Sequence, residues 1–264
     1  MAQTTKKLTK KQIKFSFQKP LEKFMTKKEL SYLSFSPRLK TVLESGRTVS
    51  ANGDPIKVHS ASTIGNIRVL RELILLEGFS RTLEVGLAYG ASALTILSSL
   101  REVSDGGGYH HAAIDPFQYK DWGGAGVRLV NDEGFADRFS LHEGLSALVL
   151  PSLFEKSESY DLIYIDGSHL FEDVFVDFYY SLRLLRVGGI ILFDDCCDAH
   201  VRKVIKFIRC NFAGIIEGID YSAVEDPQKP LKKRIGNLLG FRQIHGFRKI
   251  ADPARKWNAS FKNF

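Results

Sequence analysis

Short apolar runs alternate with longer amphipathic segments over most of the chain beyond residue 60. The runs at 163–165 and 190–193 are apolar at every position, which is typical of strands buried on both faces of a sheet. Strands that alternate with helical segments indicate parallel βαβ units. We therefore predict an α/β fold with a doubly wound, mostly parallel sheet of seven strands, at residues 82–85, 112–114, 139–142, 162–165, 189–193, 214–219 and 241–250.

The segments between these strands have the helical period. Helices are predicted at 91–100, within 123–134, and at 146–154, 171–185 and 200–212, although Pro151 fits poorly inside the third of them. A further helix precedes the first strand, where Ser62 or Thr63 can cap its start and Gly78 can end it.

Ahead of this region, apolar residues between 21 and 45 predict one or two short helices that Pro37 interrupts. The predicted organisation is a flexible basic arm at residues 1–20, a helical extension at 21–60, the main domain at 61–250 and a basic tail at 251–264.

Charge is segregated along the chain, although the net charge is only +7. Residues 1–50 and 227–264 each carry a net charge of +9, whereas residues 51–226 carry −11. Enzymes that act on nucleic acids normally have basic charge around the active cleft, so no nucleic-acid partner is expected. The basic ends are either solvated or make peripheral contact with an anionic surface, such as lipid, a polyanionic carbohydrate or a protein partner.

The three cysteines, Cys196, Cys197 and Cys210, form a poor disulfide framework, because their number is odd and two are adjacent. A reducing compartment suits them better. No apolar run reaches the roughly 18 residues that span a bilayer, and no apolar segment of a secretory signal follows the first residues. We therefore expect a cytoplasmic location.

The candidate chemistry lies at the predicted strand ends, where parallel α/β sheets bind ligands. The first strand is followed by Gly86 and Gly90, whose spacing allows a backbone turn to approach a ligand closely. The next strand ends at Asp115, where a carboxylate can accept both ribose hydroxyls of an adenosine-containing ligand. The three-glycine spacing of dinucleotide-binding loops is absent, which disfavours NAD.

Two sequence patterns resemble class I methyltransferases that use S-adenosylmethionine (SAM). The segment Glu84-x-Gly86-x-x-x-Gly90 is similar to their SAM-binding loop. Residues 160–169 (YDLIYIDGSH) and 185–195 (LRVGGIILFDD) resemble the bacterial metal-dependent O-methyltransferases of the macrolide-sugar type. The likeness covers about residues 60–215 and implies a Rossmann-like fold, SAM as cofactor and a Mg²⁺ or Mn²⁺ ion.

The resemblance also implies roles for single residues. Glu84, Gly86 and Gly90 would line the methionine part of SAM, with Ser92 just beyond the loop, and Asp115 would hold the ribose. Glu143 and Gly144 would lie near the adenine, and Ser146 is a weaker candidate there. Asp166, Asp194 and Asp195 match the metal ligands, and His169 matches a proposed general base.

Elementary chemistry agrees with these roles, because three carboxylates at the ends of central strands can bind a hard divalent cation. Such an ion lowers the pKa of a bound hydroxyl, and His169 could then accept the proton near neutral pH. Structural roles remain open: Asp194 or Asp195 could cap the helix near His200, Asp166 could terminate its strand, and His169 could cap or pack at the start of the next helix.

We therefore predict a SAM-dependent methyltransferase that methylates a hydroxyl of a small molecule or sugar with the help of a divalent metal. A metal-independent methyltransferase and a non-catalytic binding protein of the same fold are the alternatives. An NAD-dependent or nucleotide-sugar-dependent enzyme is disfavoured, because a Tyr-x-x-x-Lys pair is also missing after Tyr179 and Tyr180.

Overall fold

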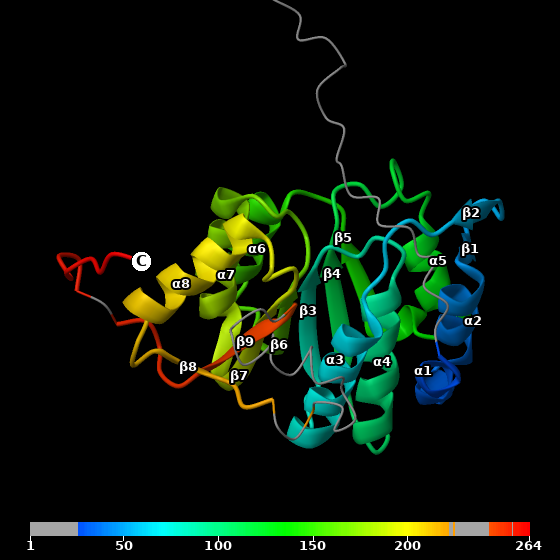
Figure 1. The fold of residues 1–264 in the computed structure, drawn as a ribbon, viewed down its shortest axis with the longest axis horizontal. Helices are drawn as coiled ribbons and strands as arrows, with labels where there is room; N and C mark the ends of the chain where they lie inside the picture. The colour runs from blue at the N-terminus through cyan, green and yellow to red at the C-terminus, as the bar shows by residue number, and fades with distance from the viewer. Residues whose placement is uncertain (1–25, 222–223, 225–242, 255) are drawn as a thin grey trace, which may run out of the picture.

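A seven-stranded sheet runs through the centre of the protein, with helices on both faces (Figure 1). The computed structural model describes residues 26–221, 224, 243–254 and 256–264. The sheet has the order β5-β4-β3-β6-β7-β9-β8, in which β9 runs antiparallel to both of its neighbours. The strands are β3 (Arg81–Val85), β4 (His110–Ile114), β5 (Phe139–His142), β6 (Tyr160–Ile165), β7 (Leu185–Phe193), β8 (Ile216–Gly218) and β9 (His245–Lys249).

The prediction of a doubly wound, mostly parallel seven-stranded sheet is thus confirmed. The predicted arm at 1–20, the start of the extension at 21–25 and residues 241–242 of the last predicted strand lie outside the described residues.

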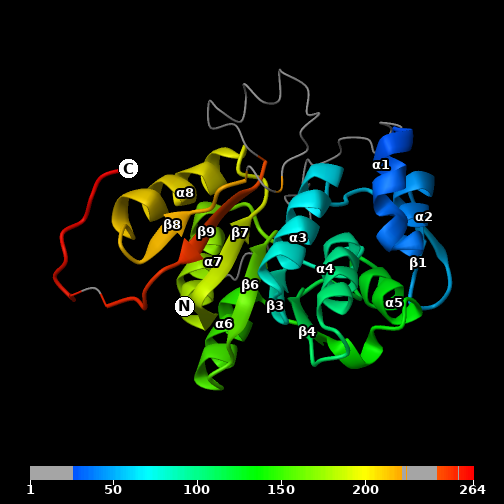
Figure 2. The ribbon, with the colours of Figure 1, turned by 90° about the horizontal axis from the view of Figure 1, so that it is seen from below.

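Helices from the two halves of the chain cover opposite faces of the sheet, as Figure 2 shows from below. One face packs against α3 (Ile64–Glu77), α4 (Ala91–Val103) and α5 (Ala125–Asp132), and the other against α6 (Ser146–Glu155), α7 (Phe171–Leu184) and α8 (Ala199–Asn211). A short 3-10 turn, η2 (Ala136–Arg138), leads into β5. The alternation of side chains along β6 explains the two layers of helices. Ile163 and Ile165 point towards α6, α7 and α8. Leu162 and Tyr164 point towards the opposite face, which α3 and α4 cover.

The predicted caps of α3 are confirmed. Thr63 accepts a hydrogen bond from the backbone of Asn66, and Gly78 ends the helix in the left-handed conformation at φ 62°. Helix α6 continues through Pro151.

The N-terminal extension packs beside α4 and α5 and contains α1 (Lys27–Tyr32), the 3-10 turn η1 (Leu33–Phe35) and α2 (Pro37–Ser45). Pro37 begins α2, where its missing N–H costs nothing. The short helices predicted between 21 and 45 are joined, within the extension at 21–60, by a hairpin that was not predicted. In it β1 (Arg47–Val49) and β2 (Pro55–Lys57) pair antiparallel. No helix among the described residues is long and apolar enough to cross a membrane.

Strand register aligns the candidate site. Val85 pairs with Ile114 on one side and with Ile165 on the other, and Ile165 pairs with Phe193. The residues that follow these four strand ends are Gly86, Asp115, Asp166 and Asp194. They therefore lie in one row along the carboxyl edge of the sheet.

Candidate active site

The glycine loop between β3 and α4 is held tightly by neighbouring backbone. Gly86 and Gly90 have φ values of 98° and 80°, in the region that favours glycine. A Cβ on Gly86 would collide with the carbonyl oxygen of Asp166, and one on Gly90 would lie 3.0 Å from the Cα of Gly126. Both glycines are therefore required by the protein's own packing, which fixes the loop against α5 and the end of β6.

Asp115 fastens the same loop. Its Oδ2 accepts hydrogen bonds from the backbone N–H groups of Leu87 (3.2 Å) and Ala88 (2.9 Å), and its Oδ1 accepts one from Phe117 at 2.8 Å. The side-chain amide of Gln118 lies 3.5 Å from Oδ2 and also donates to the carbonyl oxygen of Ala88. The carboxylate thus shapes the glycine loop, and its predicted contact with ribose stays a prediction.

The remaining predicted cofactor residues differ in exposure. Glu84 is fully buried, and neither of its carboxyl oxygens has a hydrogen-bond partner among the described residues, although Oε1 lies 3.3 Å from Nε2 of His111. Ser92 is buried in the first turn of α4. Glu143 is exposed just after β5 and Gly144 is half-buried beside it, whereas Ser146 is the first residue of α6. Their contacts with a cofactor stay predictions.

Asp194 is buried, and both of its carboxyl oxygens already accept hydrogen bonds. Oδ2 accepts from the Asn66 amide and from the Tyr164 hydroxyl, each at 2.6 Å. Oδ1 accepts from the backbone N–H of Asp195 at 2.6 Å and from the amide of Gln243 at 3.2 Å. This clamp positions the end of β7, and Asp194 is not part of the group of close donor atoms described next.

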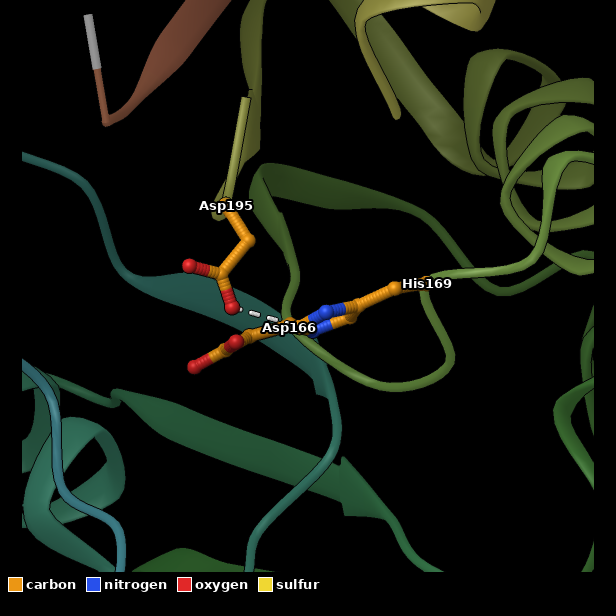
Figure 3. Close-up of side chains that lie close together, drawn as sticks. All are labelled: Asp166, His169 and Asp195. Atoms are coloured by element: carbon orange, nitrogen blue, oxygen red, sulfur yellow. Dashed lines mark ion pairs between the residues drawn. The ribbon is translucent and has the colours of Figure 1, made fainter. Parts of the chain in front are cut away.

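Three other predicted residues converge beside the clamp (Figure 3). Asp166, His169 and Asp195 each offer one donor atom, and these atoms all lie within 4.8 Å of one another. Nε2 of His169 lies 3.0 Å from Oδ2 of Asp195. Asp195 adopts a left-handed backbone conformation (φ 48°), a conformation that Asp tolerates and that recurs at functional sites. A small crevice beside this group is lined in part by Asp166, Ser168 and His169.

The structural alternatives for these residues are resolved in part. Asp198, rather than Asp194 or Asp195, caps α8 by accepting a hydrogen bond from the backbone of His200 at 2.8 Å. Leu170, rather than His169, is the N-cap residue of α7.

The acidic side chains repel one another. Burial, together with the charges of Asp194 and Asp195, raises the pKa of Asp166 well above its ordinary value. Burial also raises the pKa of Asp194, and the hydrogen bond from Tyr164 opposes that shift. A bound cation would relieve this repulsion, so the donor set fits a divalent metal ion.

Sequence reasoning missed the side chains that hold Asp194. Asn66 and Tyr164 each interrupt an otherwise apolar buried face, which is a usable signal. Gln243 hydrogen-bonds to both Asp194 and Asp195. No signal in the sequence indicates this contact, because Gln243 is 48 residues from Asp195 in a segment without recognised motifs.

Comparisons with known proteins agree with this picture. Residues 83–196 match the model of a family described as a methyltransferase domain. A search of curated proteins found no match.

Solved structures with the same fold include an O-methyltransferase from Bacillus cereus in complex with SAH (18% identity, TM-score 0.58, 87% of this chain and 100% of that chain). The O-methyltransferase TomG from Streptomyces achromogenes, involved in tomaymycin synthesis and in complex with SAM, is similar at 15% identity (TM-score 0.56, 87% of this chain and 93% of that chain). An SAH-bound methyltransferase from Podospora anserina is similar at 17% identity (TM-score 0.52, 72% of this chain and 80% of that chain). These findings agree with the resemblance inferred from the sequence: residues 83–196 match the methyltransferase-domain model, and the chain has the fold of the solved methyltransferases.

Proposed function

We propose that this protein transfers the methyl group of SAM to a hydroxyl of a small molecule or sugar, with the help of a divalent metal ion. The observation that carries the proposal is the convergence of Asp166, His169 and Asp195 at the same sheet edge as the glycine loop. Solved structures of this fold that contain SAM or SAH support SAM as the cofactor.

In this proposal the loop at residues 86–90 and Asp115 bind SAM. The loop is preorganised, since Asp115 and the backbone around Asp166 and Gly126 hold it before any ligand binds. Preorganisation lowers the entropy cost of ordering the loop when SAM binds. It would also fix the sulfonium methyl relative to the acceptor hydroxyl, and such positioning supplies much of the rate of a transfer reaction.

Asp166 and Asp195 would hold the metal ion. Mg²⁺ in proteins is typically bound by one or two carboxylates, with water and substrate oxygens completing its shell. When bound, the ion would stabilise the deprotonated hydroxyl of the acceptor. Asp194, whose oxygens are occupied by four donors, would position Asp195 rather than bind the ion in this arrangement.

His169 would accept the proton of the acceptor hydroxyl. A carboxylate beside the ring orients it and stabilises the imidazolium that forms when the ring takes up a proton. Asp195 is placed for this role, at 3.0 Å from Nε2 of His169. Nε2 is the ring nitrogen that would take up the proton, because Nδ1 is buried. Vicinal hydroxyls are the favoured acceptors, because two adjacent oxygens can chelate the ion.

The test is methyl transfer from labelled SAM to a panel of catechols and sugar diols, with EDTA and then with added Mg²⁺ or Mn²⁺. We expect turnover to stop in EDTA and to return with metal. Asp195→Asn should lose both turnover and calorimetric metal binding, whereas Asp137→Asn, an exposed carboxylate on η2, should retain both. Full turnover in EDTA would refute the metal role and leave a metal-independent methyltransferase with His169 as its base.

A further inference from the structure

The outer face of α8 carries a continuous basic stripe. Arg202, Lys206 and Arg209 follow the i, i+4, i+7 spacing of one helix face, Lys203 lies beside them, and all four are exposed. Within the described part of the chain, the side chains of Arg202, Lys203 and Lys206 have no ion-pair or hydrogen-bond partner. No described acidic side chain therefore neutralises these three residues of the stripe.

The C-terminal segment is fastened beside this stripe. The side chain of Asn211 makes two hydrogen bonds of 2.9 Å with the backbone of Lys262, one to its carbonyl oxygen and one from its N–H. The ring of Phe264 lies 5.1 Å from that of Phe207 on α8 and 6.4 Å from that of Phe171 on α7. Both ribbon views place the end of the chain next to α8 (Figures 1 and 2).

The segment itself carries exposed aromatic and basic side chains. Trp257 is 97% exposed and Phe261 is 63% exposed, although apolar rings of this size are usually buried. Lys256 and Lys262 are exposed beside them. We refer to α8 residues 202, 203, 206 and 209, with 256, 257, 261 and 262 of the tail, as the α8–tail surface.

We propose that the α8–tail surface binds anionic membrane lipid at the bilayer surface. Lysine and arginine are attracted to anionic headgroups, and tryptophan favours the interface, where its ring is partly apolar and its N–H is hydrated. The tail also projects at the outer edge of the molecule, where a planar bilayer can approach it (Figure 1).

The test is co-sedimentation of the full chain with phosphatidylcholine vesicles, with and without phosphatidylserine. We expect binding only to the phosphatidylserine vesicles and a loss of binding as salt is raised. R202E/K206E should weaken binding at least about tenfold, since each basic residue near the surface contributes measurably. R47E/K57E reverses two exposed charges on the β1–β2 hairpin and is the matched control, for which we expect little change.

W257A provides a second, independent variant, because a side chain that is 97% exposed contributes little to folding. It should weaken binding severalfold, with an unchanged circular dichroism spectrum. Absence of binding to phosphatidylserine vesicles, or equal losses in R202E/K206E and R47E/K57E, would overturn the proposal. Tighter binding to a DNA or RNA oligonucleotide than to vesicles, weakened by the same variants, would assign the surface to nucleic acid instead.

Discussion

Asp177 gives the stability of this protein a distinctive pH dependence. The residue lies on α7, is only 1% exposed and belongs to the interface that α7 forms with α6. Burial raises the pKa of Asp177 from 3.8 to about 7, and the hydroxyl of Ser146 on α6 opposes only part of that shift. The folded protein therefore keeps a proton on Asp177 over a pH range in which the unfolded chain has lost it.

The sign and size of the effect follow from this difference. Because the folded-state pKa is raised, the contribution of Asp177 to the free energy of unfolding is greatest at about pH 4 and below, falls as the pH rises towards 7, and levels after that. Each pH unit between the two pKa values is worth about 1.4 kcal/mol, so ionisation of Asp177 costs at most about 4 kcal/mol at pH 8. Asp177→Asn keeps the shape of the side chain and removes the charge.

The assay is urea unfolding of the wild type and the Asp177→Asn variant at pH 5 and pH 8. We expect the variant to be more stable than the wild type by about 1–2 kcal/mol at pH 5 and by about 4 kcal/mol at pH 8, so the gap should widen by about 3 kcal/mol. Asp137→Asn, which changes an exposed carboxylate, should follow the wild type at both pH values. If Asp177→Asn loses as much stability as the wild type between pH 5 and pH 8, the reasoning is wrong.

Three further predictions concern the candidate site. Gly90→Ala should destabilise the protein by about 1–3 kcal/mol in urea unfolding, more than Gly78→Ala, which has a similar positive φ but nothing within 4 Å of the added Cβ. Asp115→Ala should weaken SAM binding in calorimetry by about 1–3 kcal/mol, because it leaves the N–H groups of the glycine loop unpaired. An unchanged affinity would show that Asp115 does not contribute to cofactor binding. Asp194→Ala should lose turnover but still bind SAM, because Asp194 would position Asp195, one of the two carboxylates that we propose to hold the metal. Loss of SAM binding as well would contradict this division.

The sequence predicts the fold well where apolar runs end abruptly. The predicted strands ending at 85, 114, 142, 165 and 193 all end at those residues in the structure. Each run is followed at once by a glycine or an acidic residue that does not favour a buried strand. Both the strand ends and the row of candidate site residues could therefore be predicted from the sequence. The hairpin at 47–57 was missed because its strands have only three residues each, too short for an alternating pattern to stand out.

The site was predictable in its residue types but not in its internal arrangement. Adjacent acidic residues after a central strand indicated a cation site, yet they do not reveal which of them faces it. Asn66 and Gln243 hold the carboxylate of Asp194 by hydrogen bonds, and they lie 128 residues before it and 49 residues after it. Contacts between residues so far apart leave no local pattern in the sequence. The left-handed backbone of Asp195 is likewise invisible in the sequence.

The central claim is that the carboxyl edge of β3 and β4 binds SAM, and titration calorimetry of the full chain tests it most directly. We predict that SAM and SAH bind at micromolar concentrations, that NAD does not bind, and that Asp115→Ala weakens both SAM and SAH. Absence of heat with SAM and SAH, or equal binding of NAD, would contradict the account.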